Sequence, residues 1–169
     1  MHKKLLKLIT PKVYKSGAIL SKNRHYRYAL WRIWDERKPW VLFIGLNPST
    51  ADESHDDNTL KKCIHYASQW GYGGVYMANL FAVRATKPSV MKQHRSPIGS
   101  ANDDHLDDLY NRAGIVVAAW GNDGVYQNRS AAIKDKYSSL YCMKVNKSGE
   151  PGHPLYLTND ASCFPFRCE

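Results

Sequence analysis

The sequence has 169 residues, 43% of them hydrophobic, and a formal net charge of +9. This length suits one domain with a hydrophobic core and excludes two domains of ordinary size. Because no apolar run approaches the roughly 20 residues of a membrane-spanning helix, and no apolar segment with a cleavage site follows the basic N-terminus, we expect neither a membrane protein nor a signal peptide.

The positive charge is concentrated near the N-terminus. Residues 1–40 contain eleven lysines and arginines and two acids, whereas residues 41–169 contain thirteen residues of each sign. A basic segment of this kind either binds a polyanion such as nucleic acid or is a solvated surface. We expect residues 1–16 to form a basic arm and residues 17–169 to form a single α/β domain.

The first half of the chain predicts a short arm and then strands. Residues 3–9 form either a short amphipathic helix or an irregular arm. Residues 17–20 and 26–33 predict two antiparallel strands joined by a turn, and the polar–apolar alternation in the second is typical of a sheet with one face in water. Residues 40–46 predict a buried strand, because they contain a short run rich in β-branched and aromatic residues.

The rest of the chain alternates helices with apolar strands. Two stretches, residues 86–102 and residues 146–169, predict long loops. The expected order is a helix over 60–70, a strand over 75–78, a helix from 102 or 103 to 113, a strand over 115–119, a helix over 125–138 and a strand over 140–145. Repeated β–α units with nearly continuous apolar strands predict a three-layer α/β/α sandwich with a mostly parallel central sheet, preceded by a β-hairpin.

The four cysteines are Cys63, Cys142, Cys163 and Cys168, and none forms a Cys-x-x-Cys pair. Such spacings suit reduced thiols better than a zinc or iron–sulfur site. We therefore expect a cytoplasmic protein without a metal or another cofactor. We also expect it to be a monomer.

The strand over 40–46 leads directly into a polar turn that contains Asn47 and Pro48. Ligands of open α/β sheets bind at the carboxyl ends of the strands, which is where this turn lies. Asn47 is therefore either a ligand-binding residue or a turn residue whose side chain bonds its own backbone.

Four motifs lie at or beyond strand ends: Gly45-Leu-Asn-Pro-Ser49, Asn79-Leu-Phe-Ala-Val-Arg-Ala-Thr86, Trp120-Gly121 and His153-Pro-Leu-Tyr-Leu157. In this order they resemble motifs of the uracil-DNA glycosylase superfamily, especially its mismatch-specific and single-strand-selective branches. Over about residues 25–160 the chain also resembles DUF1643, an uncharacterised bacterial and phage family with recurring Asn-Pro-Ser-Thr-Ala-Asp and His-Pro-Leu-Tyr-Leu segments.

The first resemblance implies a nucleobase N-glycosylase-like hydrolase that acts on nucleic acid, a nucleoside or a nucleotide. Asn47 would then orient the attacking water, and His153 would stabilise the leaving base. The substrate-binding residues that it implies are Gly45, Pro48, Ser49, Asn79, Phe81, Arg84, Trp120 and Tyr156.

The chain also departs from that superfamily. Ser49 follows the proline where a glycine or tyrosine is typical. An acidic cluster, made of Asp52, Glu53, Asp56 and Asp57, stands beside the expected pocket, where it would repel a phosphate backbone. These acids either cap the next helix or bind Mg²⁺. The alternatives are therefore a non-catalytic module that binds nucleic acid or nucleotides, and a metal-dependent nucleotide enzyme.

Overall fold

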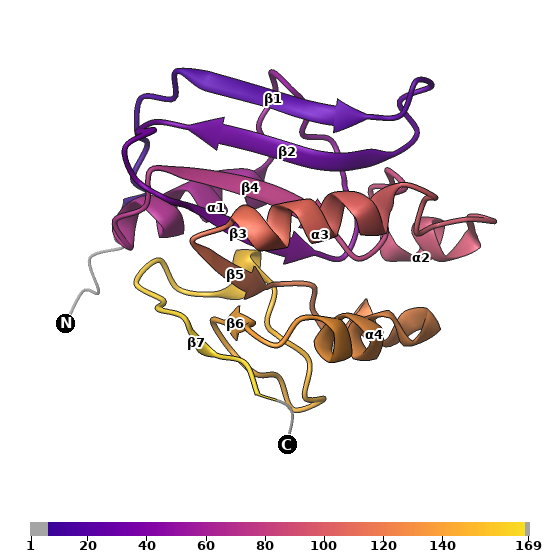
Figure 1. The fold of residues 1–169 in the computed structure, drawn as a ribbon. Helices are drawn as coiled ribbons and strands as arrows, with labels where there is room; N and C mark the ends of the chain where they lie inside the picture. The colour runs from indigo at the N-terminus through magenta and orange to yellow at the C-terminus, as the bar shows by residue number, and fades with distance from the viewer. Residues whose placement is uncertain (1–6, 168–169) are drawn as a thin grey trace.

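The computed structural model describes residues 7–167, and their helices and strands are arranged around one sheet (Figure 1). The strands are β1 (Lys15–Leu20), β2 (Arg27–Ile33), β3 (Trp40–Gly45), β4 (Gly74–Asn79), β5 (Ile115–Ala118), β6 (Tyr141–Cys142) and β7 (Phe164–Pro165). The α-helices are α1 (Asn58–Gln69), α2 (Pro88–Gln93), α3 (Asn102–Arg112) and α4 (Arg129–Lys136), and the 3₁₀ segments are η1 (Asn122–Asn128) and η2 (Pro154–Tyr156). No helix within the described range is long and apolar enough to cross a membrane.

The sheet is mixed, and its strand order is β1-β2-β4-β3-β5-β6-β7. The central strands β4, β3, β5 and β6 pair in parallel. At one side the β1–β2 hairpin joins β4 in antiparallel orientation, and at the other side β7 pairs antiparallel with β6. The α/β class and the N-terminal hairpin are thus confirmed. The central strands are parallel, as expected, but the sheet as a whole is mixed, because the hairpin and β7 are built into it in antiparallel orientation.

Apolar side chains cover both faces of the sheet. On one face Leu42 of β3 belongs to the same core cluster as Leu106 of α3 and Ile133 of α4. On the other face Phe43, the next residue of β3, belongs to the cluster that contains Leu60 of α1. Successive side chains of a strand point to opposite faces, so the continuous apolar run in β3 matches helices on both sides.

Strand β2 is buried along most of its length, although its alternating pattern predicted one wet face. Arg27 and Arg32 are only 4% and 3% exposed. The reason is that the segment between β3 and α1 lies against these two side chains. Arg27 donates to the Ala51 carbonyl at 2.8 Å, and Arg32 donates to the Asp52 carbonyl at 2.7 Å.

Several boundaries differ from those predicted. The helix expected over 125–138 is interrupted because Gln127 and Asn128 have φ angles of 52° and 54°, and α4 starts only at Arg129. The loop expected over 86–102 contains α2, and the strand expected over 140–145 is reduced to β6. The loop-rich tail contains η2 and β7.

The expected arm lies partly outside the described residues, which begin at 7, so a helix over 3–9 is not tested. Strand β1 starts at Lys15, two residues before the expected domain boundary at 17. Before it, the Ile9 backbone N–H donates to Nδ1 of His65 in α1 at 2.8 Å. This part of the arm therefore lies against the domain.

Side chains of α1 hold the segment that follows η2. Lys62 Nζ donates to the Leu157 carbonyl at 2.7 Å, and the Tyr66 hydroxyl donates to the Thr158 carbonyl at 2.9 Å. At the C-cap of α1, Trp70 Nε1 donates to the Ala161 carbonyl at 3.1 Å. These bonds hold the segment after η2 along the length of α1, and η2 itself contacts the same helix.

Candidate functional site

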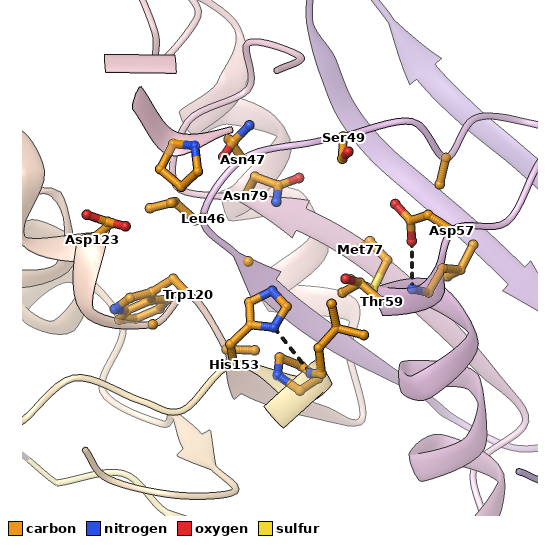
Figure 2. A pocket seen from close by; sticks show the side chains of 18 of the residues that line it. Leu46, Asn47, Ser49, Asp57, Thr59, Met77, Asn79, Trp120, Asp123 and His153 are labelled. Atoms are coloured by element: carbon orange, nitrogen blue, oxygen red, sulfur yellow. Dashed lines mark hydrogen bonds between the residues drawn. The ribbon is translucent and has the colours of Figure 1, made fainter. Parts of the chain in front are cut away.

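A pocket of about 470 Å³ lies at the carboxyl ends of the parallel strands β3, β4 and β5 (Figure 2). Residues at or just beyond the ends of these strands line it, among them Gly45, Asn79 and Trp120. The first turn of α1 and the turn that contains η2 complete the wall. Pockets for small-molecule ligands have volumes of about 300–1,000 Å³, so this one has room for a nucleobase with part of its sugar.

Most of the residues expected at the site line this pocket. They are Gly45, Asn47, Ser49, Asn79, Trp120, His153 and Tyr156. Figure 2 shows Asn47 and Asn79 on one side of the hollow and His153 on the other. Asn47 and His153, which are more than a hundred residues apart in the sequence, therefore share one cavity.

The side-chain amide of Asn47 is held by two backbone carbonyls. Its Nδ2 donates to Pro48 O at 3.0 Å and to Ala85 O at 2.8 Å. A primary amide has two N–H hydrogens, and both are used here. The side-chain oxygen of Asn47, Oδ1, is thus the amide atom left to face a ligand, and it can only accept a hydrogen bond.

The imidazole of His153 has a defined neutral form. The Leu155 backbone N–H donates to Nδ1 at 3.2 Å, so the proton of the neutral ring is on Nε2. Burial lowers the pKa of His153 below its ordinary value of 6.5, although the negative charge of Asp57 acts in the opposite direction. His153 therefore presents a neutral N–H donor at pH 7.

Asn79 is 4% exposed, and a residue that the sequence did not indicate sets its orientation. Nη2 of Arg27 donates to Asn79 Oδ1 at 3.4 Å. Gly45 leaves room for the other end of the amide, since a Cβ there would be 2.9 Å from Asn79 Nδ2. In the described part of the chain Nδ2 has no hydrogen-bond partner, so Asn79 offers donors to the pocket.

The two aromatic residues have different positions. Trp120 is 1% exposed, and its Nε1 donates to a carboxylate oxygen of buried Glu150 at 2.6 Å, so it is a fixed wall. Tyr156 is 86% exposed, and its ring centroid is 5.5 Å from that of His153. Of the two, Tyr156 is the one whose ring is available to stack on a ligand.

Phe81 and Pro48 do not line the pocket. Phe81 is fully buried in the core, with its ring centroid 5.7 Å from that of Tyr126. Pro48 is buried, and its carbonyl accepts from Asn47 Nδ2 and from the Ala85 backbone N–H. Both residues support the site from behind.

Arg84 also lies outside the pocket, in an adjoining open hollow of about 520 Å³. This hollow contains the basic side chains of Arg24 and His25, and it shares Ser49 with the first pocket. Arg84 Nη1 donates to the Arg24 carbonyl at 3.3 Å. Among residues 7–167 Arg84 forms no ion pair within 4.0 Å, so its charge is available to an anion.

The acids of the expected cluster are engaged locally. Asp52 accepts the backbone N–H groups of Ser54 and His55, bonds that hold its pKa well below the ordinary range. Asp57 caps α1 by accepting the Leu60 N–H at 2.8 Å. Glu53 forms an ion pair with Arg24 at 3.1 Å, and Asp56 forms one with Arg32 at 2.9 Å. Of the acids expected to cap the next helix, only Asp57 does so, and Glu53 and Asp56 form ion pairs instead. Residues 7–167 contain no group of three His, Cys, Asp or Glu side chains arranged to hold a metal.

No pattern in the sequence indicates Arg27 or Glu150 as a residue of the site. Arg27 stood out only as one of the basic residues of the first forty, because its burial depends on the segment around Ala51. Glu150 did not stand out at all, because it lies in a polar turn and its burial depends on Trp120 and Ser130, which are distant in sequence.

The family model DUF1643, described as a protein of unknown function, matches residues 27–155. No curated protein and no solved structure matches the chain. Neither comparison adds support to the resemblance to glycosylases.

Proposed function

The chain belongs to the DUF1643 family, and from its pocket we propose that it is a nucleobase N-glycosylase-like hydrolase acting on nucleic acid, a nucleoside or a nucleotide. The observation that supports this proposal is the pairing of a fixed acceptor, Asn47, with a neutral donor, His153, in one cavity of suitable size. Helices on both faces of the sheet suit the three-layer arrangement of the glycosylase superfamily.

In the proposed reaction the bond between the base nitrogen and C1′ of the sugar breaks, and its electron pair moves onto the base. The Asn47 carbonyl oxygen accepts a hydrogen bond from a water molecule and directs the water's lone pair at C1′. An amide is a poor base, so Asn47 acts by orientation while positive charge develops on the sugar. After the new C–O bond has formed, the water's extra proton passes to solvent, and the released base anion takes up a proton from solvent, so that the products are the free base and the sugar with a hydroxyl group on C1′.

The leaving base gains negative charge, and two side chains of the pocket can stabilise this charge by donating hydrogen bonds. His153 offers Nε2–H, and Asn79 offers the N–H groups of Nδ2. Because these donors are preorganised in a partly enclosed pocket, each stabilises the developing charge more than water does. Tyr156 at the mouth supplies a ring for stacking.

Base release tests the proposal. The full chain is incubated with single-stranded oligonucleotides, nucleosides and nucleotides of each common base, and free base is measured by chromatography. We expect release from at least one substrate, and a loss of at least about 100-fold in Asn47→Ala and in His153→Gln. Tyr137→Phe, which removes a hydrogen bond to Asp107 away from the pocket, should retain the rate. Equal rates in wild type and Asn47→Ala would exclude this role.

A second candidate is a non-catalytic module that binds nucleic acid or nucleotides in the same pocket. The adjoining hollow with Arg84 favours it, since an arginine without a carboxylate partner suits a phosphate. Oligonucleotide binding without release of any base would select this candidate.

A further inference from the structure

We propose that Arg27 and Asn79 form a subsite for an oxyanion, so that the ligand of the pocket carries a phosphate or a carboxylate. This inference rests on the proposed function for the identity of the ligand as a base derivative. It narrows that function to substrates with an anionic group rather than neutral nucleosides.

The first observation is the incomplete pairing of the Arg27 guanidinium. Arg27 lines the pocket and is 4% exposed. Nη1 donates to the Ala51 carbonyl at 2.8 Å and Nη2 to Asn79 Oδ1 at 3.4 Å, while Nε is buried and has no partner. A guanidinium has five N–H donors, so three are unused among the described residues.

The second observation is that this buried cation touches no carboxylate. Within residues 7–167 no carboxylate oxygen lies within 4.0 Å of an Arg27 nitrogen. Asp57 and Asp52 act on it through space, but Arg84 and Arg32 act in the opposite sense. Burial lowers the pKa of Arg27 to about 10, so the group stays charged at neutral pH. Buried charges are costly unless a counter-charge is supplied, and here a ligand can supply it.

The third observation is the neighbouring amide. Nη2 of Arg27 donates a hydrogen bond to Asn79 Oδ1, so the Asn79 amide presents Nδ2 to the pocket. Together the two side chains offer only donors. An oxyanion, which only accepts hydrogen bonds, complements such a wall, whereas an amino group meets no acceptor there.

Titration calorimetry on the full chain at constant ionic strength tests this subsite. Adenosine, guanosine, cytidine and uridine are each compared with their 5′-monophosphates, and uracil is compared with orotate. We expect at least one anionic member to bind at least about tenfold tighter than its neutral partner. If a 5′-monophosphate binds tighter than its nucleoside, the anionic group of the ligand is on the sugar. If orotate binds tighter than uracil, the anionic group is on the base. If no pair shows a preference, the inference is wrong.

Three variants connect the preference to the residues. Arg27→Gln should abolish it, while Arg37→Gln, which alters an exposed arginine paired with Asp35 outside both hollows, should keep it. If Arg27→Gln does not fold, Asn79→Asp is used as the test variant. The new carboxylate next to Arg27 Nη2 would accept hydrogen bonds from the guanidinium and repel a bound anion. Asn79→Asp should also raise the thermal midpoint of the ligand-free chain. An anion preference that survives either substitution overturns the assignment.

The proposed function and the subsite can fail separately. His153→Gln should lose base release yet keep the anion preference, since His153 forms no bond to Arg27 or Asn79. Anion binding without base release leaves the subsite intact and removes the glycosylase reaction. Base release with equal kcat/KM for charged and neutral substrates would exclude the oxyanion subsite but leave the proposed reaction intact.

Discussion

Nδ1 of His153 accepts the backbone N–H of Leu155, two residues farther along the chain, at 3.2 Å. Pro154 between them is buried and begins η2. Proline is favoured at the first position of a helical turn, because its missing N–H and fixed φ cost nothing there. The His-Pro-Leu sequence thus defines which nitrogen of the imidazole carries the proton.

The pH dependence of base release should reflect this imidazole. Since burial lowers the pKa of His153, the ring stays neutral at pH values where an exposed histidine is half protonated. We expect kcat/KM to fall on the acid side with a midpoint below 6.5, and this limb to vanish in His153→Gln. A rate profile from about pH 4 to pH 8 measures it. A midpoint at or above 6.5, or the same limb in the variant, would contradict the prediction.

The stability of the chain should respond to the same group. Its folded pKa lies below the value of the unfolded chain, so the unfolded state binds more protons as the pH falls below 6.5. The free energy of unfolding contributed by His153 is therefore complete above 6.5 and is lost on acidification towards the folded pKa. Urea titrations of wild type and His153→Gln should diverge across this window, with the wild type losing more stability. Parallel curves would show that the ring does not titrate differently on folding.

Asn47→Ala should reduce stability as well as activity. The substitution leaves the carbonyls of Pro48 and Ala85 without the donors that Nδ2 provides, at a cost of about 1–2 kcal/mol in the free energy of unfolding. Chemical denaturation measures this, with Tyr137→Phe as a variant of comparable cost away from the pocket. An unchanged denaturation midpoint would mean that these bonds contribute nothing net.

Glu150 should be important for folding. Its carboxylate accepts from Trp120 Nε1 at 2.6 Å and from Ser130 Oγ at 3.0 Å, and it is 4% exposed. Glu150→Leu strands two buried donors, so we expect a loss of about 2–4 kcal/mol, and a smaller loss in Glu150→Gln, which keeps an acceptor oxygen. Urea titration of the two variants checks the order, and equal losses would argue against the hydrogen bonds as the cause.

If the chain binds a polynucleotide, Arg84 should contribute one phosphate contact. Arg84→Gln should then reduce the slope of log affinity against log salt by about 0.7 for a single strand. Arg37→Gln is the matched control, because Arg37 is exposed and paired with Asp35 at 3.0 Å. Fluorescence anisotropy at several salt concentrations gives both slopes. The same slope in wild type and Arg84→Gln would place the phosphate elsewhere.

The sequence predicted the central strands well because β3 and β5 are short, continuous apolar runs. The strand ends also placed Asn47 and Asn79 at one edge of the sheet, whereas His153, which lies in a loop, was expected there only from the resemblance to glycosylases. The sequence could not predict that Phe81 turns into the core, because an aromatic residue just beyond a strand can face either side. The burial of Arg27 depends on the distant segment around Ala51, and no periodicity encodes that contact.

The bonds from α1 to residues 157–161 have a consequence for the order of assembly. The segment that follows His153 is held by side chains of α1 and its C-cap, so it can dock only after β3, β4 and β5 have paired and α1 has packed on them. The imidazole lines the same pocket as Asn47 only after this last segment has docked along the helix. We therefore expect fraying of the contacts made by Lys62, Tyr66 and Trp70 to disable the cavity while the sheet beneath it stays intact.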